Sequence, residues 1–317
     1  MKIFTDANPS KYPNGSVVTI GAYDGVHLGH RYLISKTIEI ARNIGASSVV
    51  VTFDRHPASV VRPGSAPLLL SEASQKLDCL AETGVDAVCV VTFDQNRANE
   101  SAVDFVEEFL VGELNVKMVV VGSDFHFGHN RQGNVELLEI LGEKHGFKVL
   151  GAPLKSPGGP GGEVLSSTLI RHLIAAGDME KALQYLGRLY ELRGHVEHGD
   201  SRGGNELGYP TANVTFSSLM ATPPDGIYAG WVILENGERY VAAISLGTRP
   251  TYYPGGGERL LEAFILGFDG DLYGEEIKVQ FGKKIRDQER FSTSEELMAK
   301  ITEDIARVEA FCATHSL

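Results

Sequence analysis

The first half of the chain alternates short runs of β-branched residues with longer amphipathic stretches. The runs SVVTI (16–20), ASSVVVTF (46–53) and KMVVVG (117–122) have the composition of strands, and residues 28–43 and 71–84 have helical periodicity. Strands that are almost wholly apolar are usually covered on both faces of their sheet. The alternation therefore predicts an α/β fold with a doubly wound, mostly parallel sheet, whose ligands bind beyond the carboxyl ends of the strands.

The period changes at about Leu189 to that of strands separated by glycine-rich turns. The expected strands, with no helix between them, are YELRGHVEHG (190–199), GIYAGWVILENG (226–237), RYVAAISLG (239–247), RLLEAFILGF (259–268) and IKVQFGKKI (277–285). The amphipathic segment from Ser294 to about Phe311 is expected to form a closing helix. This half is predicted to be a small antiparallel β-barrel domain with a C-terminal helix. The domains are expected at residues 1–186 and 187–317.

Composition and charge narrow the class of protein. With 317 residues, 43% of them hydrophobic, the chain is long enough for two domains, and no apolar run approaches the roughly 20 residues of a membrane-spanning helix. A formal net charge of −12 argues against sequence-independent binding to nucleic acid or anionic lipid, but not against small nucleotides. The three cysteines lack metal-ligand spacing, and the first residues lack the apolar stretch of a secretory signal. We expect a cytoplasmic protein with reduced cysteines and with neither nucleic-acid nor membrane partners.

The segment GAYDGVHLGHR (21–31) follows a predicted strand directly and opens a helix. Unpaired N–H groups and the positive end of the dipole make such a helix start a suitable anion site. His27 and His30 can address one phosphate together and stabilise charge that develops on its oxygens. An incidental spacing or a metal pair is the alternative, which the strand placement and the flanking glycines disfavour, and the chain has no GxxxxGK[ST] P-loop. The expected phosphate-contacting residues of this turn are Gly21, Asp24, Gly25 and Gly29.

Four segments of this half resemble known enzymes. HLGH after a strand resembles the HxGH signature of the nucleotidyltransferase superfamily. The other three, which resemble elements of bacterial FAD synthetases, are TFDRHP (52–57), VGSDFHFGHNRQG (121–133) and LSSTLIR (165–171). Arg55, where proline is common, and His126 depart from the family pattern. The resemblance implies a nucleotidyltransferase-type domain that converts FMN to FAD.

The positions of these segments make physical sense of the resemblance. Polar residues that follow strand ends can converge on one crevice, and hydroxyls at a helix start with a guanidinium one turn later suit β- and γ-phosphates, although SST alone is equally a simple helix cap. The resemblance implies that His27, His30 and Arg171 carry catalysis. It implies that the triphosphate contacts Ser166, Ser167 and Thr168, and that the flavin contacts Phe53, His56, Pro57, Asp124 and Arg131.

In the barrel half, a carboxylate interrupts the apolar segment RLLEAFILGF. Burying Glu262 there without a partner would cost several kcal/mol, so a site is expected to open onto this strand. Such a carboxylate can take the proton from a primary hydroxyl. The alternative is an edge-strand carboxylate that faces water.

The frame GHVEHGDSRGGNELGYPTANV (194–214) resembles the riboflavin kinase family, as do AAISLGTRPTY (242–252) and LEAFILGFDGDLYG (261–274). The resemblance implies that Glu262 is the catalytic base for the riboflavin hydroxyl. Thr211 and Asn213 offer the oxygen ligands that Mg²⁺ prefers. Residues implied to bind ATP in this half are Gly194, His198, Gly199 and Gly208.

The resemblance covers almost the whole chain and implies a bifunctional enzyme of FAD biosynthesis. Its expected ligands are riboflavin, FMN, FAD and ATP, with Mg²⁺ as cofactor. Three alternatives remain: an adenylyltransferase for pantetheine phosphate or nicotinate mononucleotide, a flavin-binding sensor without turnover, and a chain in which only the kinase half is active. The first is typically a single-domain enzyme, and the catalytic residue types present here argue against the second.

Overall fold

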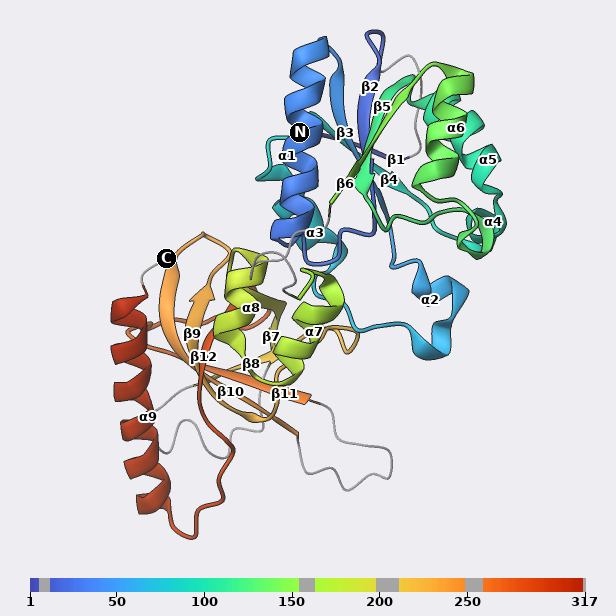
Figure 1. The fold of residues 1–317 in the computed structure, drawn as a ribbon. Helices are drawn as coiled ribbons and strands as arrows, with labels where there is room; N and C mark the ends of the chain where they lie inside the picture. Colours follow the sequence, from blue (N-terminus) through green and yellow to red (C-terminus); the bar gives the residue numbers. More distant parts are fainter. Residues whose placement is uncertain (6–11, 154–162, 198–210, 249–258, 316–317) are drawn as a thin grey trace. The chain divides into compact units, whose positions relative to one another are not determined.

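The chain contains two compact units, Met1–Ser167 and Thr168–Leu317, each with its own sheet (Figure 1). This computed structural model describes residues 1–5, 12–153, 163–197, 211–248 and 259–315. Two helices lie close to the border between the units, α7 (Ser167–Ala175) and α8 (Met179–Leu186). Because α8 packs against strands of the second unit, this grouping differs from the division after residue 186 that the pattern suggests. Where the two catalytic domains divide stays a prediction.

The described part of the first unit holds a six-stranded parallel sheet in the order β1-β4-β3-β2-β5-β6. Its strands are β1 (Lys2–Thr5), β2 (Ser16–Ile20), β3 (Ser47–Phe53), β4 (Ala87–Val91), β5 (Val116–Gly122) and β6 (Lys148–Ala152). The order changes direction between the neighbouring strands β2 and β5, so a topological switch point lies there. The doubly wound fold is confirmed.

Helices cover both faces of this sheet, with α1 on one side and α4, α5 and α6 on the other (Figure 1). The helical segments are α1 (Leu28–Ile44), α2 (Ala58–Val61), η2 (Pro63–Ser65), α3 (Ala73–Ala81), α4 (Gln95–Asn99), α5 (Ala102–Asp104), the π-helical η3 (Phe105–Glu113), η4 (His129–Arg131) and α6 (Val135–His145). Ser101 caps the helical segment that follows it, since its Oγ accepts from the Asp104 amide at 3.0 Å. Beyond that cap the helix is π-helical, which the amphipathic pattern does not reveal.

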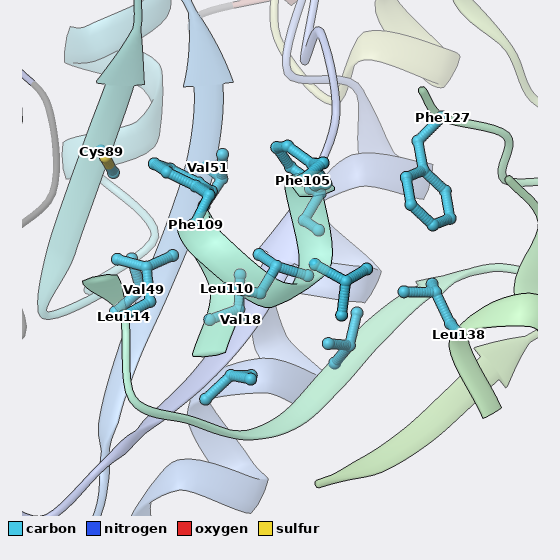
Figure 2. Close-up of a cluster of buried hydrophobic side chains, with 14 of the residues drawn as sticks. Val18, Val49, Val51, Cys89, Phe105, Phe109, Leu110, Leu114, Phe127 and Leu138 are labelled. Carbon is cyan, nitrogen blue, oxygen red and sulfur yellow. The ribbon is translucent and has the colours of Figure 1, made fainter. Parts of the chain in front are cut away.

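Alternate residues of the central strands enter different cores. On one face, Val49, Val51 and Cys89 pack with the phenylalanines of η3 (Figure 2). On the other face, Val50 packs with Ile34 of α1 among the buried residues. Because apolar side chains are needed on both faces, the strands are continuous apolar runs, as the sequence indicates.

The second unit is a closed antiparallel barrel in the strand order β10-β11-β8-β7-β12-β9, followed by α9 (Ser294–Thr314). Its strands are β7 (Tyr190–Glu197), β8 (Thr211–Thr215), β9 (Gly226–Ile233), β10 (Arg239–Thr248), β11 (Arg259–Ile265) and β12 (Glu276–Arg286). Helix α9 runs along the barrel wall (Figure 1), where Val308 and Cys312 pack against Trp231. The barrel with its C-terminal helix is confirmed, and β8 is a strand that the pattern shows only as a motif.

Candidate active sites

The turn after β2 brings His27 and His30 together at the start of α1. His27 caps the helix, because its Nδ1 accepts from the His30 amide at 3.3 Å. The two imidazole rings stack with their centroids 3.6 Å apart. A Cβ at position 29 would lie 3.1 Å from the His27 ring, so Gly29 leaves room for this stack. Two ring systems that can donate hydrogen bonds thus lie at a helix N-terminus, where an anion is favoured.

The same turn has an unusual backbone. Tyr23 and Val26 have φ of 50° and 37°, which costs non-glycine residues about 1–3 kcal/mol each. The Tyr23 hydroxyl lies 2.6 Å from Thr19 Oγ1, and burial raises the pKa of Tyr23 far above its usual value. Gly25, which lies between Tyr23 and Val26 in the sequence, also has a positive φ, of 79°. The packing around the buried Tyr23 ring therefore holds a conformation that the local sequence disfavours.

The structure gives Asp24 a different environment from a phosphate contact. Its buried carboxylate accepts from the amides of Leu70 and Ser71, at 2.9 and 3.1 Å. These bonds join the turn to the segment that precedes α3. The Ser71 hydroxyl accepts from the Gly25 amide at 3.0 Å and strengthens the same junction. Asp24 thereby shapes the turn, and its contact with phosphate stays a prediction.

The LSST segment reaches this turn through Ser167, whose Oγ donates to the Asp24 carbonyl at 2.9 Å. Leu165 is buried, and Ser166 is half-buried beside it. Thr168 and Arg171 fall in the second compact unit. Their contact with a triphosphate, like that of Gly21, stays a prediction.

The residues expected to contact flavin follow β3 and β5, at the same edge of the sheet as the histidine turn. Phe53 ends β3, and its ring packs edge-on against the ring of Phe93 with the centroids 5.1 Å apart. His56 Nδ1 accepts from the Ala58 amide at 3.1 Å, which fixes the ring beside Pro57 at the start of α2. The other two residues, Asp124 and Arg131, are exposed in the loop after β5.

The two departures from the family pattern, Arg55 and His126, are both exposed side chains. Arg55 is exposed and turns toward Asp54, with Nη2 3.0 Å from the carboxylate. Burial disfavours ionisation of Asp54, but hydrogen bonds from the Phe93 amide and from Arg55 outweigh it and lower the pKa. His126 is exposed, with Nδ1 2.8 Å from the carbonyl of Asp124.

One residue at this edge of the sheet, Lys76, is not indicated by the sequence as part of a site. Lys76 lies in the amphipathic helix α3, where a lysine is normally solvated, yet it is only 8% exposed. Its Nζ donates to the Phe53 carbonyl at 2.7 Å. Lys76 also lines a small cavity of about 40 Å³, together with His56 and Ser71.

In the barrel, Glu262 of β11 lies between Asn213 of β8 and Ser245 of β10 in the ladder. Its strand neighbours Leu261 and Ala263 are fully buried, whereas Glu262 is half-buried. Since successive side chains alternate, Glu262 lies on the outer face of the barrel. Directly opposed residues share a face, so Asn213 and Ser245 lie there too.

This face lines a cavity of about 340 Å³, which is within the range of small-molecule sites, about 300–1,000 Å³. Glu262, Thr211 and Ser245 are polar residues of its lining, and apolar walls come from β11 and α9, including Phe264, Leu297 and Ile305. A cavity therefore lies beside the Glu262 strand, and its role as the expected site stays a prediction.

A buried ion pair that the sequence does not indicate closes one wall of this cavity. Arg286 of β12 contacts Asp304 of α9 with Nη2 and Oδ2 2.7 Å apart, and the side chains are 10% and 5% exposed. Beyond Arg286 the chain continues to Gln288, whose Nε2 donates to Ser245 Oγ at 3.1 Å. These contacts attach the connection before α9 to the strand that neighbours Glu262.

The remaining residues implied for the kinase differ in what the structure says of them. Gly194 lies in β7, where a Cβ would be 2.2 Å from the Thr215 carbonyl, so close packing of β7 on β8 requires glycine. His198, Gly199 and Gly208 lie outside the described residues. Within the described ranges, no cluster of three or more His, Cys, Asp or Glu side chains could hold a metal.

The two units therefore carry separate candidate sites, the histidine turn of the parallel sheet and the cavity of the barrel that Glu262 lines. Comparison with known proteins agrees. A FAD synthetase family model matches residues 10–168, and a riboflavin kinase model matches residues 186–312. Bifunctional riboflavin kinase/FMN adenylyltransferase of Escherichia coli K12 is 38% identical over 94% of this chain and 93% of its own. That of Buchnera aphidicola from Acyrthosiphon pisum is 32% identical over 99% of both chains.

A crystal structure described as a macrolide-efflux protein from Streptococcus pneumoniae has a TM-score of 0.86 and 28% identity, and the match covers 98% of this chain and 99% of that one. The chain belongs to the family of bifunctional riboflavin kinase/FMN adenylyltransferases. No helix in the part of the chain that the structure describes is long and apolar enough to cross a membrane.

Proposed function

We propose that this bifunctional enzyme phosphorylates riboflavin in the barrel cavity and adenylylates FMN at the histidine turn of the parallel sheet. Family membership supports both activities, together with ATP as the phosphate donor. The observation that carries the kinase assignment is the position of Glu262 and Thr211 on one face of the barrel, in the lining of a cavity of about 340 Å³.

In the kinase reaction, the Glu262 carboxylate takes the proton of the riboflavin 5′-hydroxyl as the hydroxyl oxygen attacks the γ-phosphorus of ATP. The bond between that phosphorus and the β-phosphate oxygen breaks, and ADP leaves with the electron pair. The apolar walls of the cavity suit a planar ring system and exclude water from the reacting hydroxyl.

Thr211 and Asn213 would hold Mg²⁺ in this site. They lie two residues apart on β8, so their side chains share a face with Glu262, and hydroxyl and amide oxygens are ligands suited to a hard cation. When bound, Mg²⁺ neutralises charge on the ATP phosphates.

In the adenylyltransferase reaction, an FMN phosphate oxygen attacks the α-phosphorus of ATP and pyrophosphate leaves. The nucleophile is already ionised, so the protein needs to position the reactants and stabilise transition-state charge rather than remove a proton. The stacked His27 and His30 at the start of α1 support this role. Arg171 and the hydroxyls of Ser166, Ser167 and Thr168 are proposed to bind the pyrophosphate portion, and the loops after β3 and β5 the flavin.

Chromatography of flavins after incubation with riboflavin, ATP and Mg²⁺ tests both halves. His30→Ala is expected to stop FAD formation and to leave FMN formation intact, and Glu262→Gln is expected to do the reverse when FMN is supplied. His145→Ala and Glu276→Gln are matched controls away from both sites. Formation of FMN alone by the wild type would restrict activity to the barrel, and loss of both activities in either variant would contradict two separate sites. A cytoplasmic location stays a prediction.

A further inference from the structure

Lys76 joins two segments that the proposed adenylyltransferase site requires. Its Nζ donates to the Phe53 carbonyl at 2.7 Å, where β3 passes into the segment with His56. A longer contact of 3.4 Å reaches the Ala22 carbonyl, in the turn that carries His27 and His30. One ammonium group thus binds the backbone of the flavin segment and the backbone of the phosphate turn.

Two nearby carboxylates act against the cost of burying the positive charge of Lys76. Burial lowers the pKa of Lys76, and the carboxylates of Asp24 and Asp54 act in the opposite direction. Asp24 is itself fixed by the Leu70 and Ser71 amides, just before the helix that carries Lys76. Desolvating an ammonium group is unfavourable, and an apolar side chain could fill this space without that cost.

The hydrogen bonds of Lys76 link the flavin segment to the histidine turn, so they bear on how FMN and ATP are positioned against each other. The segment after β3 is proposed to contact FMN, and the turn after β2 is proposed to contact ATP. Small displacements of reacting groups lower the rate strongly, because the attacking oxygen must lie in line with the phosphorus. We propose that Lys76 is a positioning residue of the FMN adenylyltransferase site, which sets the flavin segment against the histidine turn. This inference rests on the proposed function of the first unit.

The test compares Lys76→Met, which keeps most of the length of the side chain but has no charge or donors, with Lys76→Arg, which keeps the charge and the donors. Lys36→Met is the matched control, since Lys36 is half-buried on α1 and pairs only with Glu39 among the contacts described, at 2.7 Å. In Lys76→Met, kcat for FMN adenylylation is expected to fall about tenfold or more, with KM for ATP and FMN within about threefold of wild type. Lys76→Arg is expected to recover most of kcat. Riboflavin kinase activity of the same full-length proteins reports that the barrel is intact.

Several outcomes would overturn the inference. A folded Lys76→Met protein with wild-type kcat removes the positioning role, and a rise in the KM for FMN alone indicates a direct ligand contact instead. If Lys76→Met does not fold while Lys76→Arg has wild-type kinetics and a wild-type thermal transition, the role is stability alone. Absence of FAD formation by the wild type contradicts the proposed function itself, and is therefore distinguishable from failure of the Lys76 inference.

Discussion

Glu262 of β11 lies directly opposite Asn213 of β8 in an antiparallel ladder of the barrel. The two residues are far apart in the sequence, yet the register places their side chains on one face, beside the cavity that Glu262 lines. The proposed base and one proposed magnesium ligand are thereby fixed by backbone hydrogen bonds rather than by a mobile loop.

This pairing predicts a metal-dependent defect. Asn213→Ala removes one proposed oxygen ligand, so the rate of riboflavin phosphorylation is expected to fall by about 10- to 100-fold, with a higher Mg²⁺ concentration needed for half-maximal rate. Titration of Mg²⁺ in the kinase assay measures this effect, with Asn43→Ala on the exposed face of α1 as control. An unchanged Mg²⁺ dependence would remove Asn213 from the metal site.

The buried pair of Arg286 and Asp304 predicts a loss of stability. Asp304→Ala leaves a guanidinium that is 10% exposed without its carboxylate, which typically costs about 3–5 kcal/mol. Urea unfolding followed by Trp231, the single tryptophan of the chain, reports on the barrel. Glu303→Gln on the same helix removes pairs of an exposed carboxylate with Lys300 and Arg307, and is expected to change little. Equal midpoints for the two variants would contradict this account.

The contact between β9 and its neighbours predicts that Gly230 cannot be replaced. An added Cβ would lie 2.0 Å from the Gln280 carbonyl and 2.6 Å from Ile244 Cδ1. Gly230→Ala is expected to destabilise the barrel by about 1–3 kcal/mol or more, because the backbone must shift. Gly64→Ala, where a Cβ would meet nothing within 4 Å, is the control. Thermal unfolding measures both, and an unchanged melting temperature for Gly230→Ala would show that the strands separate easily.

The buried thiol of Cys312 predicts alkaline destabilisation of the barrel. Burial raises the pKa of Cys312 from 9.0 to about 11, although Arg239 acts in the opposite direction. Between these values the unfolded chain has lost a proton that the folded chain keeps, so the free energy of unfolding falls as pH rises. This contribution is complete below pH 9.0 and is lost as the pH passes through about 11. Cys312→Ala is expected to flatten that part of the pH profile of urea unfolding, whereas Cys79→Ala, in the first unit, is not. Identical slopes of the free energy of unfolding against pH for the wild type and Cys312→Ala would contradict this prediction.

Much of the architecture could be predicted from local patterns. Apolar runs such as residues 47–53 indicate a sheet covered on both faces, and the change to glycine-rich strands after Leu189 indicates a barrel. The edge strands β1 and β6 escaped prediction, since β1 is short and mostly exposed and shows no alternation. The strand β8 is not indicated by a strand pattern, since its residues belong to the frame of residues 194–214. The π-helical geometry of η3 is not indicated by the pattern of apolar residues.

The candidate sites, like the fold, could be predicted from the sequence only in part. The residue types of the histidine turn and of Glu262 are visible in the sequence because each conflicts with a simple structural role: two imidazoles at a helix start, and a carboxylate in an apolar strand. Residues whose contacts depend on partners distant in the sequence are not visible in it. Lys76 has the sequence context of a surface helix, and Arg286 and Asp304 become a pair only when β12 and α9 come together.

By itself, then, the sequence determined the central strands of the sheet, most strands of the barrel and several of the longer helices. It also determined which residue types can bind phosphate, because these properties follow from local periodicity and side-chain chemistry. Tertiary structure alone decided that Asn213 faces Glu262, that a cavity of about 340 Å³ lies beside them, and that Lys76 joins two loops. Such relationships depend on strand register and chain closure, where a shift of one residue would turn every side chain to the other face.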